Sequence, residues 1–141
     1  MIKNLTVTFE LKTVISAKEI HSLVSFLKKE LSFTIDFLEV LFVDTDKMIS
    51  YNRKYLAHDY STDVISLNFS EETFVLGGLI IISIPEAAKN AKIYKEKHRD
   101  ELCRLVVHGI LHLLGYEDGS TKERGIMKNK ENYFLSKFST Y

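Results

Sequence analysis

Hydrophobic and polar positions follow two different periods along the chain. In residues 5–11 (LTVTFEL) they alternate one by one, which is typical of a strand with one buried face. Residues 79–84 (LIIISI) form a continuous apolar run of strand length, typical of a strand buried on both faces. The expected strands are residues 5–11, 35–43, 62–69 and 79–84.

Other segments repeat their apolar positions every three or four residues, which is the period of a helix that packs on a core. Ser16 with Glu19, and Ser120 with Glu123, have the spacing of a capping box, which satisfies backbone N–H groups where a helix begins. Pro85 suits the first turn of a helix. The expected helices are residues 16–31, 44–55, 85–97 and 100–114, with a terminal helix from residue 120.

Composition is that of an ordinary folded protein, with 45% hydrophobic and 27% charged residues. A chain of 141 residues can bury a core without disulfides. A single proline and no low-complexity stretch predict one domain over residues 1–141. Nineteen basic residues balance 19 acidic ones, so attraction to a polyanion must come from a local patch.

Signal peptides, membrane spans and disulfides are the sequence features that indicate where a protein is located. No signal peptide or membrane span is visible, and the lone Cys103 cannot form an internal disulfide. We therefore expect a cytoplasmic protein with no membrane partner and with Cys103 as a buried thiol. His21 and His98 are expected to face solvent.

The strongest chemical signal lies in the helix expected over residues 100–114. His108 and His112 stand four residues apart, which puts both rings on one helix face with Cβ atoms about 5–6 Å apart. Apolar residues surround this helix on nearly every side, and a buried imidazole needs partners for both ring nitrogens. A metal ion would satisfy one nitrogen of each ring. Two separately hydrogen-bonded core histidines are the alternative.

Three further residues favour the metal. Gly109 is costly inside a helix and indicates close approach by another group, or tight helix packing. Gly115 can end the helix and turn the chain back, so that Asp118 offers an oxygen ligand. Two histidines and a carboxylate leave a fourth position for water, as in catalytic zinc sites. The predicted ligands of one divalent ion, Zn²⁺ as the first choice, are His108, His112 and Asp118.

The same motif argues against a peptidase. Zinc proteases of the HExxH type carry their general base directly after the first histidine, and here that residue is Gly109. The acidic candidates for a catalytic role are Glu117 and Asp63. Each has an alternative role as an acceptor behind a metal ligand or as a cap of a helix or turn.

Three stretches resemble one known family. The stretch HGILHLLGYEDG resembles the signature HGxLHLxGYDH of the YbeY family of bacterial endoribonucleases and ribosomal-RNA maturation factors. The stretch YNRKYLAHDYSTDVIS is similar to the family's NxxYRxxDxPTDVLSF segment, and Gly77-Gly78-Leu79 to its Gly-Asp-Ile stretch. The matching positions of the second stretch are Asn52, Tyr55, Asp59, Thr62, Asp63, Val64 and Ser66.

This resemblance implies an α+β fold, in which helices pack on a small mixed sheet of about four strands and one buried helix binds zinc. It implies a metal-dependent endoribonuclease that hydrolyses single-stranded RNA. The resemblance further implies a part in small-subunit ribosomal-RNA maturation and ribosome quality control. Single-stranded RNA and the small ribosomal subunit are thus the expected partners, and DNA is not expected.

The chain departs from the family pattern near the expected site. Asp118 replaces a histidine ligand, and its charge partly neutralises the ion, which makes bound water less acidic and favours harder ions. Leu56 stands where the family has an arginine. If that arginine contacts an RNA phosphate, Arg53 or His58 could make the contact instead. The candidate substrate-binding residues are Arg53, His58, Thr62 and Ser66.

Two interpretations stay open. The first is the metal-dependent endoribonuclease, whose RNA would meet basic clusters before and after the metal helix. These clusters are Lys89, Lys92, Lys95, Lys97, His98 and Arg99, then Lys122, Arg124, Lys128 and Lys130, and a solvated helix face is the alternative for each. The second is a non-catalytic ribosome-assembly factor, in which the ion mainly stabilises the fold around Gly115.

Overall fold

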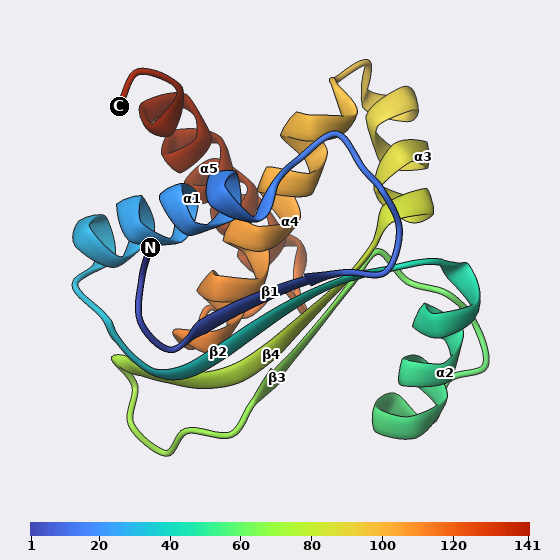
Figure 1. Cartoon of the computed structure of the whole chain (residues 1–141), viewed down its shortest axis with the longest axis horizontal. Helices are drawn as coiled ribbons and strands as arrows, with labels where there is room; N and C mark the ends of the chain where they lie inside the picture. Colours follow the sequence, from blue (N-terminus) through green and yellow to red (C-terminus); the bar gives the residue numbers. More distant parts are fainter.

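The computed structural model describes residues 1–141 (Figure 1). The strands are β1 (Leu5–Phe9), β2 (Thr34–Val43), β3 (Val64–Asn68) and β4 (Val75–Ser83). The helices are α1 (Ala17–Leu31), α2 (Thr45–Leu56), α3 (Ile84–Tyr94), α4 (His98–Leu113) and α5 (Thr121–Ser139). These elements follow along the chain in the order β1-α1-β2-α2-β3-β4-α3-α4-α5. No helix combines the length and the apolar character that crossing a membrane requires.

The four strands form one mixed sheet in the order β1-β2-β4-β3. β1 pairs parallel to β2 and β2 parallel to β4, whereas β3 pairs antiparallel to β4. The expected α+β fold with a small mixed sheet is therefore confirmed.

Helices cover both faces of this sheet (Figure 1). α1, α4 and α5 contribute to the large core on one face, which includes Ile80 and Ile82 of β4. Met48 of α2 packs with Ile81 in a smaller core on the other face. Because β4 is buried on both faces, its sequence is apolar at every position from 79 to 82, as a central strand requires.

Two glycines let α4 lie unusually close to the sheet. A Cβ atom at Gly109 would lie 2.8–3.0 Å from three side-chain atoms of Ile80. A Cβ atom at Gly78 would lie 2.6 Å from the Leu67 carbonyl oxygen and 3.0 Å from a methyl group of Leu113. The close approach that Gly109 indicated is thus tight packing of the helix on β4, and this packing fixes the height of α4 above the sheet.

The ends of three helices follow their local sequence signals. Both predicted capping boxes are present, at the starts of α1 and α5. Gly115 has a φ of 101°, and it follows α4 in a Schellman motif: the N–H of Tyr116 donates to the Leu111 carbonyl and that of Gly115 to the His112 carbonyl. Since a side chain is strained at this φ, glycine is what allows the chain to turn here.

Some boundaries and exposures differ from expectation. The helix predicted over 85–97 ends at Tyr94, because Lys95 adopts a left-handed conformation, and α4 then begins at His98. His21 does not face solvent: it is buried, and its Nδ1 accepts the N–H of Ile2 at 3.2 Å. The ring of His98 lies 3.1 Å from the Ile84 carbonyl oxygen, so it is also engaged by the protein.

Candidate metal centre

Three possible metal ligands converge beside the C-terminal half of α4. His108 and His112 occupy one face of the helix, with ring centroids 4.6 Å apart. Oδ2 of Asp118, on the loop before α5, lies 3.4 Å from Nε2 of His108 and 3.2 Å from Nε2 of His112. One ligand atom from each residue lies within 4.8 Å of those of the other two.

The spacing of these atoms suits a metal ion. Zinc binds imidazole nitrogen and carboxylate oxygen at about 2.0–2.2 Å, so neighbouring ligands in a tetrahedral site lie about 3.4 Å apart. The two nitrogen–oxygen distances, 3.4 and 3.2 Å, match this value. The group could therefore hold one divalent ion, and its three donors leave a fourth position open.

The Gly115 turn brings Asp118 back toward the helix, and a side chain of α5 braces the loop. Nη1 of Arg124 donates to the backbone carbonyls of Asp118 and Gly119, both at 3.4 Å, and Nη2 donates to Oγ1 of Thr121 at 3.2 Å. The position of the carboxylate therefore depends on both the turn and the start of the next helix.

Glu131 of α5 lies directly behind one of the imidazoles. Its Oε2 is 2.7 Å from Nδ1 of His108, and only 6% of the residue is exposed. A proton on Nδ1 donates to this carboxylate and leaves Nε2 free for an ion, which is the usual arrangement behind a metal-bound histidine. Burial lowers the pKa of His108, but the hydrogen bond and charge of Glu131, with the charges of Asp118 and Asp63, raise it above its ordinary value.

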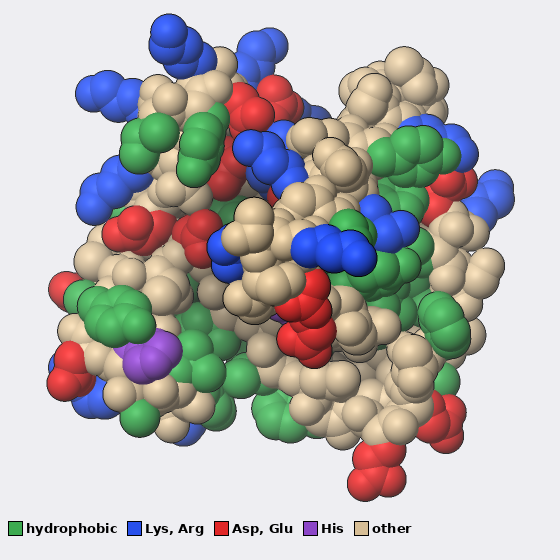
Figure 2. Space-filling model, turned by 180° about the vertical axis from the view of Figure 1, so that it is seen from behind, with side chains coloured by type: hydrophobic (Ala, Val, Ile, Leu, Met, Phe, Trp, Pro, Cys, Tyr) green, Lys and Arg blue, Asp and Glu red, His purple; other side chains and the backbone are tan.

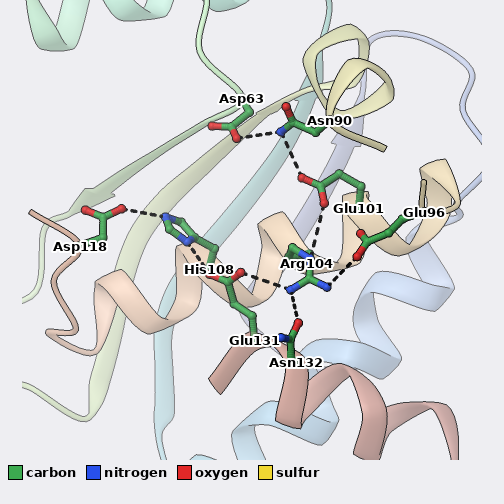
Figure 3. A network of polar contacts seen from close by, with 9 residues as sticks. All are labelled: Asp63, Asn90, Glu96, Glu101, Arg104, His108, Asp118, Glu131 and Asn132. Atoms are coloured by element: carbon green, nitrogen blue, oxygen red, sulfur yellow. Dashed lines mark hydrogen bonds and ion pairs between the residues drawn. The ribbon is translucent and has the colours of Figure 1, made fainter. Parts of the chain in front are cut away.

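Arg104 of α4 holds the acidic side chains behind the centre in place (Figure 3). Its guanidinium lies 3.5 Å from carboxylate oxygens of both Glu101 and Glu131, and 3.3 Å from one of Glu96. It also donates to Asn132 at 2.7 Å. A buried carboxylate needs such a partner, because desolvation alone would disfavour its charge.

A second branch of the network reaches the sheet. Nδ2 of Asn90 in α3 donates to Oδ2 of Asp63 at 3.0 Å and to Oε2 of Glu101 at 3.1 Å (Figure 3). Glu101 is 3% exposed, and its burial raises its pKa. The network therefore connects Asp63, at the start of β3, to the groups behind the centre.

Sequence reasoning missed most of this network. Glu101, Arg104, His108 and His112 are spaced three, four and four residues apart, which marks one polar face on α4. That spacing was available in the sequence. Glu131 lies 23 residues beyond His108 on another helix, and no local pattern indicates that the two meet.

Two cavities flank the three donors, and His108, Asp118, Asp63 and Val64 line both. The α2-side cavity, about 380 Å³, is also lined by Leu56, Thr62, Ser66, Asn68 and His112. The α5-side cavity, about 580 Å³, is also lined by Asn90, Tyr94, Arg104, Arg124, Lys128 and Glu131. The three donors thus adjoin open space on either side.

Some of the other candidate residues line these two cavities, and the rest lie outside them. Asp63 lines both cavities, whereas Glu117 is exposed and lines neither. Thr62 and Ser66 line the α2-side cavity.

Two candidates lie outside both cavities. Arg53 pairs with Asp59 at 2.7 Å, and His58 stacks on the Tyr60 ring with centroids 4.8 Å apart. Both thus contact residues of the α2–β3 connector, and neither lines a cavity beside the three donors.

A mixed sheet with a helix that presents a His-His-Asp group to open space defines a class of protein, namely an α+β domain with one candidate metal centre. The family model described as "Endoribonuclease YbeY" matches residues 1–139. The chain therefore belongs to the YbeY family.

Similar proteins agree with this membership. A protein of Cytophaga hutchinsonii named "Endoribonuclease YbeY" is 37% identical over 118 residues, which cover 84% of this chain and 82% of the relative. A Karelsulcia muelleri protein of the same name is 41% identical over 98 residues, covering 70% and 69%. The solution structure of a Thermotoga maritima protein superposes with a TM-score of 0.68 at 25% identity, covering 95% of this chain and 88% of that one.

Proposed function

We propose that this chain is a metal-dependent endoribonuclease that cleaves single-stranded RNA in the cytoplasm, as one domain spanning residues 1–141. Its proposed roles are the maturation of small-subunit ribosomal RNA and ribosome quality control, with the small ribosomal subunit as partner. The observation that carries the proposal is the convergence of His108, His112 and Asp118 between two open cavities. The family relatives named endoribonucleases supply the substrate class.

Zinc is the proposed ion, because two imidazoles and one carboxylate with an open position are a common donor set of catalytic zinc. Such an ion polarises a phosphoryl oxygen and lowers the pKa of its water. His108, His112 and Asp118 would hold the ion, and Glu131 would keep the His108 ring in orientation.

Asp63 is the proposed proton acceptor. Its carboxylate lines both cavities, and the Asn90 amide orients one of its oxygens. Glu117 is exposed outside them, so we assign it no catalytic step.

Hydroxyl groups of the α2-side cavity are the proposed contacts to the substrate. Oγ1 of Thr62 is held by the Asn52 amide at 3.0 Å, and Oγ of Ser66 is a buried atom that has no hydrogen-bond partner within the protein. Arg53 and His58 lie outside the cavities, so any contact they make would be to RNA beyond the cleavage site.

The test compares zinc-loaded protein, chelated protein and Asp118→Ala on single-stranded and duplex RNA of one sequence. We expect internal cuts in the single strand only with zinc, and a folded but inactive Asp118→Ala. Asp36→Ala, an exposed aspartate outside both cavities, is the matched control.

Two results would contradict the proposal. Folded, zinc-loaded protein that leaves single-stranded RNA intact would exclude the nuclease and favour the assembly factor. An Asp118→Ala variant that unfolds would assign the ion a structural role.

A further inference from the structure

The two cavities beside the candidate centre share the carboxylates of Asp63 and Asp118 but differ in the cations that line them. No lysine or arginine lines the α2-side cavity, where Leu56 stands 41% exposed at the position at which the family segment has arginine. The α5-side cavity is lined by Arg104, Arg124 and Lys128. A strand that crosses the centre would therefore meet cationic side chains on one side only.

Arg124 and Lys128 are the cations of the α5-side cavity that remain available to a ligand. Arg104 is only 19% exposed and lies near carboxylates of Glu96, Glu101 and Glu131, so its charge is already compensated. Arg124 and Lys128 are exposed, and neither forms an ion pair with a carboxylate.

Geometry places the two cations at one rim. They stand four residues apart on α5, so they share one helix face. Arg124 is held by the carbonyls of the loop that carries Asp118, and Nζ of Lys128 lies 5.6 Å from the centroid of the Tyr94 ring. A phosphate between them would lie beside the ligand loop of the centre.

Acidic residues in the same cavity do not prevent this. Glu101 and Glu131 are 3% and 6% exposed, and both they and the more exposed Glu96 face Arg104. Asp63 and Asp118 also line the cavity, whereas Arg124 and Lys128 are exposed and form no ion pair with any of these carboxylates. Figure 2 shows one face of the molecule on which Lys and Arg side chains are interspersed with Asp and Glu side chains around the centre, where a His side chain is just visible. The two exposed cations, rather than the buried Glu101 and Glu131, are what an approaching polyanion meets first.

We propose that Arg124 and Lys128 bind a backbone phosphate of the RNA next to the one at the candidate metal centre, so that the strand runs over the α5 rim. This rests on the proposed function, since it supplies the substrate class. The α5 rim, defined as Arg124 and Lys128, takes the place of the cation that Leu56 does not provide on the other side.

The test measures binding separately from cleavage. Zinc-loaded protein is titrated into a fluorescent 2′-O-methyl single-stranded oligonucleotide from 50 to 200 mM KCl, and anisotropy gives the Kd. We expect Arg124→Gln and Lys128→Gln each to weaken binding about 5–10-fold and to reduce the slope of log K against log[salt] by about 0.7. Lys12→Gln and Lys29→Gln remove the same charge at exposed positions outside both cavities and outside the basic clusters, and they should change the Kd less than twofold.

Two further measurements separate the possible causes. Zinc content of Arg124→Gln shows whether the Asp118 loop is intact, and Arg124→Lys should recover most of the salt slope because it restores the charge. The inference would be overturned if the rim and control variants lost equal affinity for the oligonucleotide, or if the rim variants lost none. Cleavage of natural RNA by the wild type is assayed in parallel, so failure of the nuclease proposal is seen independently of binding.

Discussion

Glu131→Gln tests whether the carboxylate behind His108 prepares the imidazole for an ion. The substitution keeps the size of the side chain and an oxygen that can accept from Nδ1. It removes the negative charge that faces the ring at 2.7 Å. We expect weaker zinc binding in a protein that remains folded.

The size of the effect follows from the surroundings of Glu131. The carboxylate is 6% exposed, so water screens it little, and its hydrogen bond to the ring is charge-assisted. Loss of such a partner behind a metal ligand weakens affinity about 10–100-fold, or about 1.4–2.7 kcal/mol. Glu131→Gln should fall at the lower end, because the amide can still accept from Nδ1. Glu131→Ala should fall at the upper end.

The assay is competition for Zn²⁺ against a chromogenic chelator at neutral pH, with circular dichroism as the check on folding. Asn132→Ala is the matched control, because it removes a neighbouring partner of Arg104 without touching His108. If Glu131→Gln binds zinc within threefold of the wild type while the control behaves likewise, the carboxylate does not support the ligand, and the reasoning is refuted.

Four other outcomes follow from the same structure. Gly109→Ala should lower the free energy of unfolding by about 1–3 kcal/mol in urea titrations, because its Cβ would press on Ile80, and Ile80→Val should recover part of this loss. Burial and the nearby N-terminal charge lower the pKa of His21 in the folded protein. The free energy of unfolding should therefore be highest above the unfolded pKa of about 6.5 and should decrease as the pH falls below that value. His21→Gln should reduce the difference between urea titrations at pH 7.5 and 5.5. Burial raises the pKa of Cys103 to about 11, so the thiol should react with a disulfide reagent only after urea unfolds the protein. Asp118→His should move the rise of the pH–rate profile for RNA cleavage to lower pH, because a neutral ligand leaves more of the charge of the ion to act on its water.

The parts of the site that could be predicted are those set by short-range geometry. The i, i+4 spacing of His108 and His112 puts their rings on one face of any helix, and Gly115 permits the turn after it. The capping boxes likewise depend on residues three apart, and both formed as predicted. Helix ends without such a signal were predicted less accurately. One example is the end of α3 before Lys95, a non-glycine residue with a positive φ.

Residues distant in sequence met only through packing of the whole chain. Glu131 reaches His108 because α5 packs against α4, and Asp63 joins the network because β3 pairs with β4 and lies beside α3. The exposed surroundings of Arg53, and the place of Leu56 in a cavity, follow from the same packing.

Local sequence thus determined which side chains share a helix face and where the chain can turn, because backbone geometry over a few residues depends on those residues alone. Tertiary structure decided which carboxylates stand behind the ligands and which cations remain free at the rim. These depend on the register of the strands and the seating of α4 on β4 through Gly78 and Gly109, where the shapes of distant side chains must fit together.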